Sequence, residues 1–532
     1  MRHLRSWLPL LLLAAAAVPL SAAAGPSVRV TGGRIAGVPG RIAPVVVYKG
    51  IPFAAPPVGE GRWKAPGPVV AWNGVRRAGS FGASCIQTIV SERKPWTYEF
   101  MTHGDISEDC LFLNVWTAAK SAKERRPVFV YIYGGGFNEG SGAVPAYDGE
   151  EMAKKGLVFV SFNYRVGVLG FLAHPELSNE QAPKASGNYG LLDQIATLRW
   201  VRENIAAFGG DPARVTVAGQ SAGGMSVHSL IASPLARRLF HRAIVQSGGS
   251  SVGGGGISTG FRLLADAERD GVTFAGAKGA ASMAELRAMS WQKLAEPLPT
   301  APGGGGAPRL RFAPIVDGYV LPAPIRDIVA GGRQHDVPTL TGANVGELGG
   351  LAAPQSPVTA EAFVARARQQ YGAMADEFLQ LFPAATDEQA ASALAESSRE
   401  QALVSMSLWA RERAKTSRTP AYTYLWDHAL PGPDAARFGA FHSSEVPYVL
   451  NTLSMSDRPF ADADRQIAGM MSSYWANFAA AGDPNGKGLP KWDPVSDRHE
   501  VMEVGDNTGP VPLTDTAARF AFFEKYLMSR SR

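Results

Sequence analysis

A serine between two glycines stands where a buried-strand pattern gives way to a helix-compatible run. The β-branched segment Val215-Thr216-Val217 leads into Gly219-Gln220-Ser221-Ala222-Gly223, and the residues from Ala222 to Ala232 favour a helix. A tight strand-to-helix turn exposes the serine hydroxyl and leaves no room for Cβ atoms at its flanking positions. In a chain with 59 glycines the pattern can arise by chance, but rarely at such a junction. Ser221 is therefore a candidate covalent nucleophile.

A glycine run follows another buried-strand pattern upstream. Residues Val128 to Tyr133 predict a strand that leads directly into Gly134-Gly135-Gly136-Phe137. The run resembles the glycine-rich oxyanion loop after the third strand of α/β-hydrolases. That resemblance implies that the backbone N–H groups of Gly135, Gly136 and Ala222 bind an oxyanion. The alternative is a flexible glycine turn without function.

The acid of such a site follows the serine in the chain, and the histidine follows the acid. The strand-like residues Val337 to Thr341 lead into a loop that carries Glu347. Asp317 and Asp336 are the alternatives, although Asp317 precedes a glycine and is more simply part of a turn.

The candidate histidines after Glu347 are His428, His442 and His499. His428 closes the predicted strand from Ala421 to Trp426, and spacing alone does not exclude it. A single histidine is more often structural than catalytic, so the residues by themselves leave the choice open.

Longer motifs are spread along the chain. They are Gly50-Ile51-Pro52-Phe53-Ala54, Pro56-Pro57-Val58-Gly59, Ser107-Glu108-Asp109-Cys110-Leu111-Phe112-Leu113-Asn114-Val115-Trp116, Asn163-Tyr164-Arg165-Val166-Gly167, Gly187-Asn188-Tyr189-Gly190-Leu191-Leu192-Asp193-Gln194, Phe208-Gly209-Gly210-Asp211-Pro212 and Ala481-Gly482-Asp483-Pro484-Asn485. With these motifs the chain resembles, over nearly its whole mature length, the type-B carboxylesterases, the cholinesterase-related branch of the α/β-hydrolases. The resemblance implies an α/β-hydrolase fold, with a large, mostly parallel sheet flanked by helices. It also implies N-terminal antiparallel strands, and loop or helix insertions over the site.

The resemblance also selects the triad. The family's acid lies in a G-x-N-x-x-E pattern, which falls on Glu347, and its histidine lies in H-x-x-E, which falls on His442. His428 then becomes a structural residue. The implied chemistry is serine-esterase hydrolysis of a small-molecule ester through an acyl-enzyme, and it calls for no metal and no organic cofactor. A catalytically inactive binding module is the alternative from another class, and amides, carbamates or thioesters would use the same mechanism.

Departures from the family pattern narrow the expected substrate. Cholinesterases carry a glutamate before the nucleophile and a tryptophan ten residues before the second cysteine, where this chain has Gln220 and Phe100. The absence of that carboxylate and of that tryptophan ring disfavours a quaternary ammonium substrate, so we expect a neutral or weakly polar ester. We also expect Gln220 and Phe100 to lie near the bound substrate. Leu348 also replaces the glycine that commonly follows the acid.

The N-terminus has the composition of an export signal. Arg2 and Arg5 precede an apolar run from Trp7 to Leu20, and small residues lead to an expected cut before Gly25. An uncleaved anchor is the alternative. We therefore expect a signal peptide at 1–24 and one catalytic domain at 25–532, periplasmic or secreted, without stable membrane insertion. With 19% charged residues and no basic tract, the chain has no nucleic-acid-binding pattern.

Two cysteines and two ion pairs complete the expectations. Cys85 and Cys110 are most simply a disulfide in an exported protein, and the family closes its first cysteine loop there; two buried thiols are the alternative. Related esterases pair the positions of Arg62 with Glu108 and of Arg165 with Asp193, which implies the same pairs here.

Strand patterns alternate with helical ones along the chain. Leu191 to Phe208 and Gln466 to Ala480 favour helices, Phe261 to Leu294 is more helical than its surroundings, and Gly253 to Gly256 and Gly303 to Gly306 predict loops. The predicted core strands are Val45 to Tyr48, Phe112 to Trp116, Val128 to Tyr133, Val158 to Asn163, Val215 to Ala218 and Ala243 to Gln246.

Overall fold

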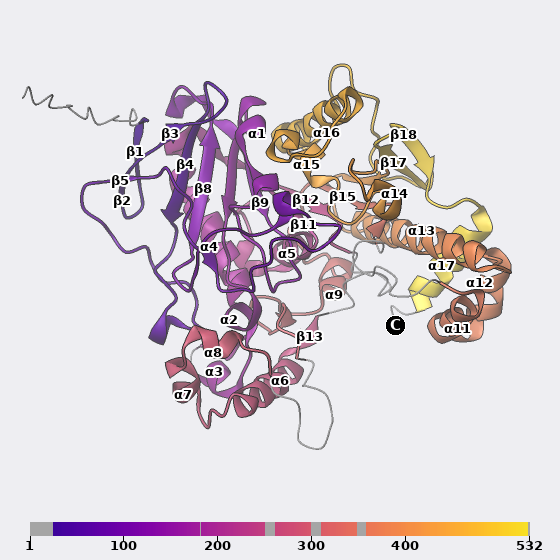
Figure 1. The fold of residues 1–532 in the computed structure, drawn as a ribbon, viewed down its shortest axis with the longest axis horizontal. Helices are drawn as coiled ribbons and strands as arrows, with labels where there is room; N and C mark the ends of the chain where they lie inside the picture. The colour runs from indigo at the N-terminus through magenta and orange to yellow at the C-terminus, as the bar shows by residue number, and fades with distance from the viewer. Residues whose placement is uncertain (1–24, 181, 250–260, 299–309, 348–357, 530–532) are drawn as a thin grey trace, which may run out of the picture.

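An 11-stranded sheet forms the centre of the protein. The computed structural model describes residues 25–180, 182–249, 261–298, 310–347 and 358–529 (Figure 1). In spatial order the strands are β18 (Gly509–Pro512), β17 (Glu500–Val504), β16 (Ala421–Trp426), β15 (Thr339–Asn344), β12 (Arg242–Gln246), β11 (Gly210–Gln220), β9 (Arg126–Ile132), β10 (Val158–Phe162), β8 (Phe112–Thr117), β4 (Val46–Pro52) and β3 (Val38–Pro39).

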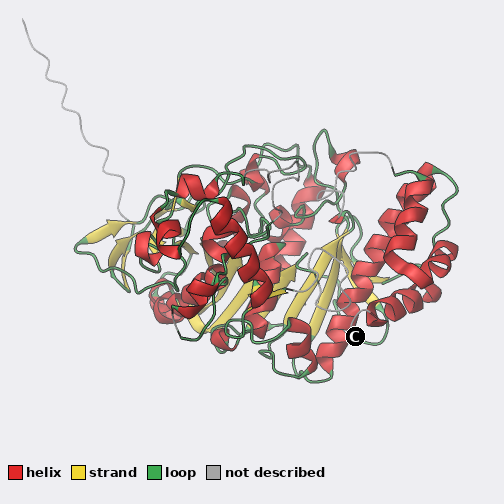
Figure 2. Cartoon of the chain, turned by 90° about the horizontal axis from the view of Figure 1, so that it is seen from below, coloured by secondary structure: helices red, strands yellow, loops and turns green. Residues whose placement is uncertain are grey.

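The sheet is parallel in its middle and antiparallel at its edges. All neighbouring pairs from β10 to β17 are parallel. The N-terminal strands β3, β4 and β8 pair antiparallel with one another and with β10, and β18 pairs antiparallel with β17. Helices flank the sheet, as Figure 2 shows from below. The predicted fold class is therefore confirmed.

The predicted strands and helices occur close to their expected positions. Strands β4, β8, β9, β10, β11 and β12 overlap the predicted core strands, and α4 (Tyr189–Asn204), α5 (Ala222–Ala232) and α16 (Asp462–Ala481) overlap predicted helices. The largest difference is in β11, which begins at Gly210 and has a register shift before Val215. The predicted helical stretch from Phe261 contains α6 (Leu264–Ala277), α7 (Met283–Ala288) and α8 (Trp291–Ala295).

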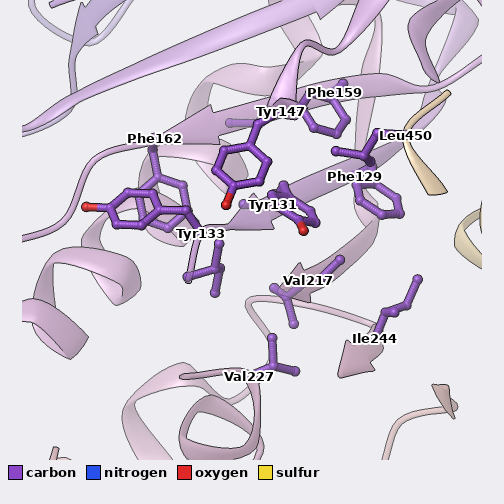
Figure 3. Close-up of a cluster of buried hydrophobic side chains, with 14 of the residues drawn as sticks. Phe129, Tyr131, Tyr133, Tyr147, Phe159, Phe162, Val217, Val227, Ile244 and Leu450 are labelled. Atoms are coloured by element: carbon purple, nitrogen blue, oxygen red, sulfur yellow. The ribbon is translucent and has the colours of Figure 1, made fainter. Parts of the chain in front are cut away.

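Aromatic side chains pack around the end of β9 that leads into the glycine run (Figure 3). Both β9 and β10 are buried on their two faces, as is usual for central parallel strands. The rings of Tyr133 and Tyr164 stack with centroids 4.3 Å apart. The hydroxyl of Tyr133 donates to the carbonyl oxygen of Tyr164 at 2.8 Å. In return, the hydroxyl of Tyr164 donates to the carbonyl oxygen of Tyr133 at 3.0 Å. These bonds hold the chain in place just before Gly134.

A second hydrophobic core, built mainly from helices, was not predicted. Helices α11 (Ala360–Tyr371), α12 (Ala375–Leu381), α13 (Asp387–Ala414) and α17 (Ala517–Ser529) share it, and they lie together at the right of Figure 1. Helix α13 is rich in alanine, serine and glutamate, so its buried positions, such as Leu403 and Trp409, form no continuous apolar stripe in the sequence.

Several expectations fall on parts of the chain that the structure does not describe. These are the signal peptide at 1–24, the glycine loops at 253–256 and 303–306, and Leu348. Among the helices of the described residues, none combines the length and the apolar character needed to cross a membrane.

Both predicted ion pairs are present. The guanidinium of Arg62 donates to both carboxylate oxygens of Glu108, with Nη2 and Oε2 2.6 Å apart. Arg165 donates to both oxygens of Asp193 at 2.8 and 2.7 Å, and both side chains are buried. Asp193 also accepts the backbone N–H of Arg165, so the second pair fixes the start of α4 against the loop after β10.

The disulfide between Cys85 and Cys110 is also present, across a sequence separation of 25 residues. A cross-link of this length is expected to contribute about 3.5 kcal/mol to the free energy of unfolding, because it restricts the unfolded chain. We expect the double variant Cys85→Ser, Cys110→Ser to lose about that much in chemical denaturation. A reductant should lower the melting temperature of the parent and leave that of the double variant unchanged. Equal melting temperatures of parent and variant without reductant would contradict the prediction.

Candidate functional site

Ser221 lies at the junction of β11 and α5 in a strained backbone conformation. Its φ is 58° and its ψ is −123°, a region that residues with a Cβ rarely adopt. Its backbone N–H donates to the carbonyl oxygen of Gln246 at 2.8 Å, which ties the turn to the end of β12. The half-buried serine is therefore held at the edge where the parallel strands end.

The two glycines around Ser221 are needed for close packing. A Cβ on Gly219 would lie 2.5 Å from the carbonyl carbon of Gly223, and a Cβ on Gly223 would lie 2.0 Å from the carbonyl oxygen of Ile132. Backbone atoms cannot move aside as a flexible side chain can, so only glycine fits at either position.

The glycine run after β9 lies directly beside this turn. A Cβ on Gly134 would come within 3.0 Å of the Cβ of Ser221. Gly135 and Gly136 have φ values of 111° and 62°, which glycine adopts without strain. Within the described residues, the backbone N–H groups of Gly135, Gly136 and Ala222 donate no hydrogen bond to the protein. These three donors therefore remain available to a ligand oxygen.

Glu347 and His442 are brought together from two separate loops. Gly346 and Phe441 form a parallel bridge, and the N–H of Gly346 donates to the carbonyl oxygen of Ala440 at 3.0 Å. Next to this bridge, Nδ1 of His442 forms a hydrogen bond with Oε2 of Glu347. The other carboxylate oxygen of Glu347 accepts the backbone N–H of Asn344 at 2.9 Å.

This contact shifts the pKa of both groups towards their charged forms. Burial by itself raises the pKa of Glu347, but the charge and hydrogen bond of His442 outweigh it, so the pKa is lowered. Burial by itself lowers the pKa of His442, but Glu347 outweighs it in turn, so that pKa is raised. The carboxylate therefore stabilises an imidazolium at His442.

The second ring nitrogen of His442 faces Gln220. The distance between Nε2 of His442 and Nε2 of Gln220 is 3.2 Å. An amide nitrogen only donates, so Nε2 of the neutral imidazole accepts here and Nδ1 carries the proton towards Glu347. The described hydrogen bonds do not include one between Ser221 Oγ and His442. Bonds of this kind are often long before a substrate binds.

The alternative acids and histidines lie in other surroundings. Asp317 accepts the backbone N–H groups of Tyr319 and Leu321, as expected of a turn residue. Asp336 binds residues 417–419. His428 lies between Asp464 and Asp506, at 2.9 and 2.6 Å, and His499 stacks on Phe520. None of these four is in contact with Ser221 or Glu347 among the contacts of the described residues.

A buried polar network beside the triad was missed by the sequence analysis. Glu445 is fully buried, and it accepts the side-chain amides of Gln246 at 3.2 Å and of Asn344 at 2.7 Å. Asn344 also donates to the carbonyl oxygen of Phe441 at 2.8 Å. Burial is the main cause that raises the pKa of Glu445, to about 7. Asn344 and Glu445 are the N of G-x-N-x-x-E and the E of H-x-x-E, so their positions were visible but their roles were not.

The two residues expected near the substrate, Gln220 and Phe100, contact the loop that carries His442. Gln220 is buried and contacts the imidazole directly. Phe100 is half-buried, and its ring centroid lies 6.1 Å from that of Phe441. Trp96 adds a hydrogen bond from its indole N–H to the carbonyl oxygen of His442 at 3.1 Å. The segment inside the disulfide loop therefore packs on the histidine loop.

Comparisons with known proteins identify the family of the chain. The model of the Carboxylesterase family matches residues 24–523. The chain is 37% identical to fumonisin B1 esterase of Sphingopyxis macrogoltabida, over 94% of this chain and 90% of that protein. It is 32% identical to cocaine esterase of Homo sapiens, over 93% and 89% of the two chains. It is 33% identical to para-nitrobenzyl esterase of Bacillus subtilis, over 82% and 86%.

The mostly parallel sheet, the strained serine turn and the family match over nearly the whole length lead to one assignment. The chain has an α/β-hydrolase fold, belongs to the carboxylesterase family and is a carboxylic ester hydrolase.

Proposed function

We propose that the protein is a serine esterase that hydrolyses neutral or weakly polar carboxylic esters with a Ser221, Glu347, His442 triad. We further propose that residues 25–532 form one catalytic domain, exported after removal of residues 1–24. The observation that carries the triad proposal is the orientation of His442. Its Nδ1 is bound to Glu347, and its Nε2 faces the residue next to Ser221.

In the proposed mechanism Nε2 of His442 takes the proton of the Ser221 hydroxyl as its oxygen attacks the ester carbonyl. Glu347 holds the ring in the tautomer in which Nε2 carries no proton, and it stabilises the imidazolium that forms. The N–H groups of Gly135, Gly136 and Ala222 stabilise the oxyanion of the tetrahedral intermediate.

His442 then protonates the departing alcohol, which leaves an acyl group on Ser221. A water molecule, deprotonated by the same nitrogen, hydrolyses this acyl-enzyme. The second tetrahedral intermediate uses the same oxyanion donors, and its collapse releases the carboxylic acid and restores the serine hydroxyl.

The neutral side chain at position 220 supports the proposed substrate class. Gln220 lies against His442 without a formal charge, so this contact offers no carboxylate to a cationic alcohol group. The similar esterases are named for different substrates, so the family alone does not select the acyl or alcohol group.

The experiment that tests the proposal is hydrolysis of p-nitrophenyl esters from acetate to dodecanoate, alongside acetylcholine and an acyl anilide. We expect hydrolysis of the neutral esters, and kcat/KM values at least about tenfold lower for the cationic ester and for the anilide. Faster cleavage of the anilide would move the assignment to an amide hydrolase. No turnover of any substrate would favour the binding-module alternative.

The pH profile should depend on the charge at position 220. Because Glu347 raises the pKa of His442, the acid limb of kcat/KM is expected above the ordinary histidine value of about 6.5. Activity rises with pH through this limb because the imidazolium cannot accept the serine proton. Gln220→Glu places a second carboxylate beside Nε2, so it should move the limb upward by about 1 to 3 pH units.

The matched control for that experiment is Gln220→Met, which removes the amide without adding charge. Its acid limb should stay near that of the parent, whatever happens to kcat. If the limbs of the two variants coincide, His442 is not the group that titrates.

A further inference from the structure

The described structure contains a pocket that lies apart from the proposed catalytic residues. Its volume is about 550 Å³. It is lined by residues 41 and 49 near the N-terminal strands, by 81–83, 98 and 103–105 around and within the disulfide loop, and by 142–145, 147, 148 and 455. Ser221, Glu347, His442 and the three oxyanion donors are not among its lining residues. The proposed mechanism therefore leaves this pocket without a role.

A β-bulge lies at Lys49, on the wall of the pocket. The pairing of β4 with β8 shifts register between Tyr48 and Ile51. Bulges of this kind re-aim side chains, and they often need glycine at positive φ. Gly50 has φ of 66°, and a Cβ there would lie 2.7 Å from the carbonyl oxygen of Ser80. The conformation that turns the chain at Lys49 is therefore available only to glycine at position 50.

The ammonium group of Lys49 is the cation of this pocket that has no ion-pair partner among the described residues. The other fixed cation, Arg41, lies 3.1 Å from Asp148 and 3.5 Å from Glu150, and so has its partners. The lining carboxylate Asp105 is exposed and solvated. Lys49 is half-buried, and burial lowers its pKa more than the nearby carboxylates raise it. An anion at this position would replace the water that the ammonium has lost.

One aromatic ring lies against the ammonium group of Lys49, and a second lines the same pocket. Its nitrogen lies 4.2 Å from the ring centroid of Phe81, which is 38% exposed. Tyr98 is 62% exposed and stacks on His103 with centroids 3.8 Å apart. Apolar groups that gather at one place are more informative than scattered ones, and here two exposed rings line one pocket. The apolar part of a ligand could therefore pack on these two rings, next to the positive charge of Lys49.

We propose that this pocket binds a monocarboxylate with an apolar chain or ring. The carboxylate forms an ion pair with Lys49, and the apolar body packs on Phe81 and Tyr98. The carboxylic acids that an ester hydrolase releases and free fatty acids both combine a carboxylate with an apolar body. The charge of Lys49 and the two rings would recognise either of them. Binding here requires neither Ser221 nor its reaction.

The test is calorimetric titration of the full protein at pH 7.5 with three ligands that share one apolar chain: octanoate, octanamide and octylammonium. Octanoate should bind at least about tenfold more tightly than octanamide, and octylammonium more weakly still, because only the carboxylate pairs with Lys49. Lys49→Met should abolish this preference, and Lys49→Arg should restore it. Phe81→Ala should weaken octanoate and octanamide alike, since it removes apolar contact. Lys487→Met is the control, because Lys487 is exposed and lies outside the pocket.

Octanoate binding that is equal in the parent and in folded Lys49→Met protein would overturn the proposal, as would equal affinities for octanoate and octanamide. Thermal unfolding of each variant checks that it is folded. If Lys49→Met does not fold, the titrations of Phe81→Ala and Lys49→Arg still test the proposal. Hydrolysis of p-nitrophenyl acetate, measured in parallel, should stay within about twofold in Lys49→Met. If the parent protein binds octanoate through Lys49 but hydrolyses no ester, the result counts against the proposed function and not against the proposed binding pocket.

Discussion

Ser221→Ala is expected to lower kcat/KM for p-nitrophenyl esters by about 10⁴- to 10⁶-fold. In the proposed mechanism the side-chain oxygen of Ser221 forms the acyl-enzyme, and alanine offers no substitute. The fold should survive, because alanine at φ of 58° is about as strained as serine and the backbone bond to Gln246 does not use the side chain. The melting temperature should therefore change by no more than about 3 °C.

A matched control for this variant is Ser229→Ala on the same helix. The hydroxyl of Ser229 donates to the carbonyl oxygen of Met225 one turn earlier, so its loss removes one local bond and no chemistry. Activity of this control should stay within about twofold of the parent. A second readout is mass spectrometry after treatment with an organophosphate, which should add one phosphoryl group to the parent and to Ser229→Ala but none to Ser221→Ala. Phosphorylation of Ser221→Ala, or residual hydrolysis near the parent's, would assign the nucleophile elsewhere.

Glu347→Gln is expected to lower kcat/KM by about 10³- to 10⁴-fold with little change in stability. One carboxylate oxygen of Glu347 accepts the backbone N–H of Asn344, and the other accepts Nδ1–H of His442. A glutamine accepts only one of these two donors. If its oxygen stays on Asn344, its NH₂ group forces Nδ1 to accept, the ring proton moves to Nε2, and the base is blocked. Position 347 therefore controls the tautomer of His442 as well as its charge.

Glu445→Gln is the matched control, because it makes the same change at the other buried carboxylate near His442. Burial raises the pKa of Glu445 to about 7, which favours the neutral form that glutamine resembles. The side-chain oxygen of Gln246 has no partner in the described structure, and a flip of that amide accepts the new NH₂ group. Activity should therefore stay within about tenfold of the parent. Losses of equal size in the two variants would contradict the assignment of Glu347 as the acid that orients His442.

Local patterns in the sequence were sufficient for the elements that build the catalytic edge. Strand β16 and helix α5 begin and end where the apolar runs predicted, and the glycine positions around residue 221 are required by backbone contacts. The family resemblance led correctly to the fold class, the disulfide and the two ion pairs. The helical core that contains α13 was missed, because many buried positions of this helix are alanine, serine or glutamate, so its buried face does not stand out as an apolar pattern.

The sequence by itself determined the nucleophile turn, the order of the candidate triad and the family, because each depends on residues that are close together in the chain. Only the tertiary structure decided which groups surround His442, because Gln220 and Glu347 reach it from segments 222 and 95 residues away in the chain. It also decided that Lys49 lines a pocket with exposed rings, since that pocket is made of at least five separated stretches of chain. Hydrogen bonds and charges act over a few ångströms in space, and a linear pattern contains that information only for neighbours in the chain.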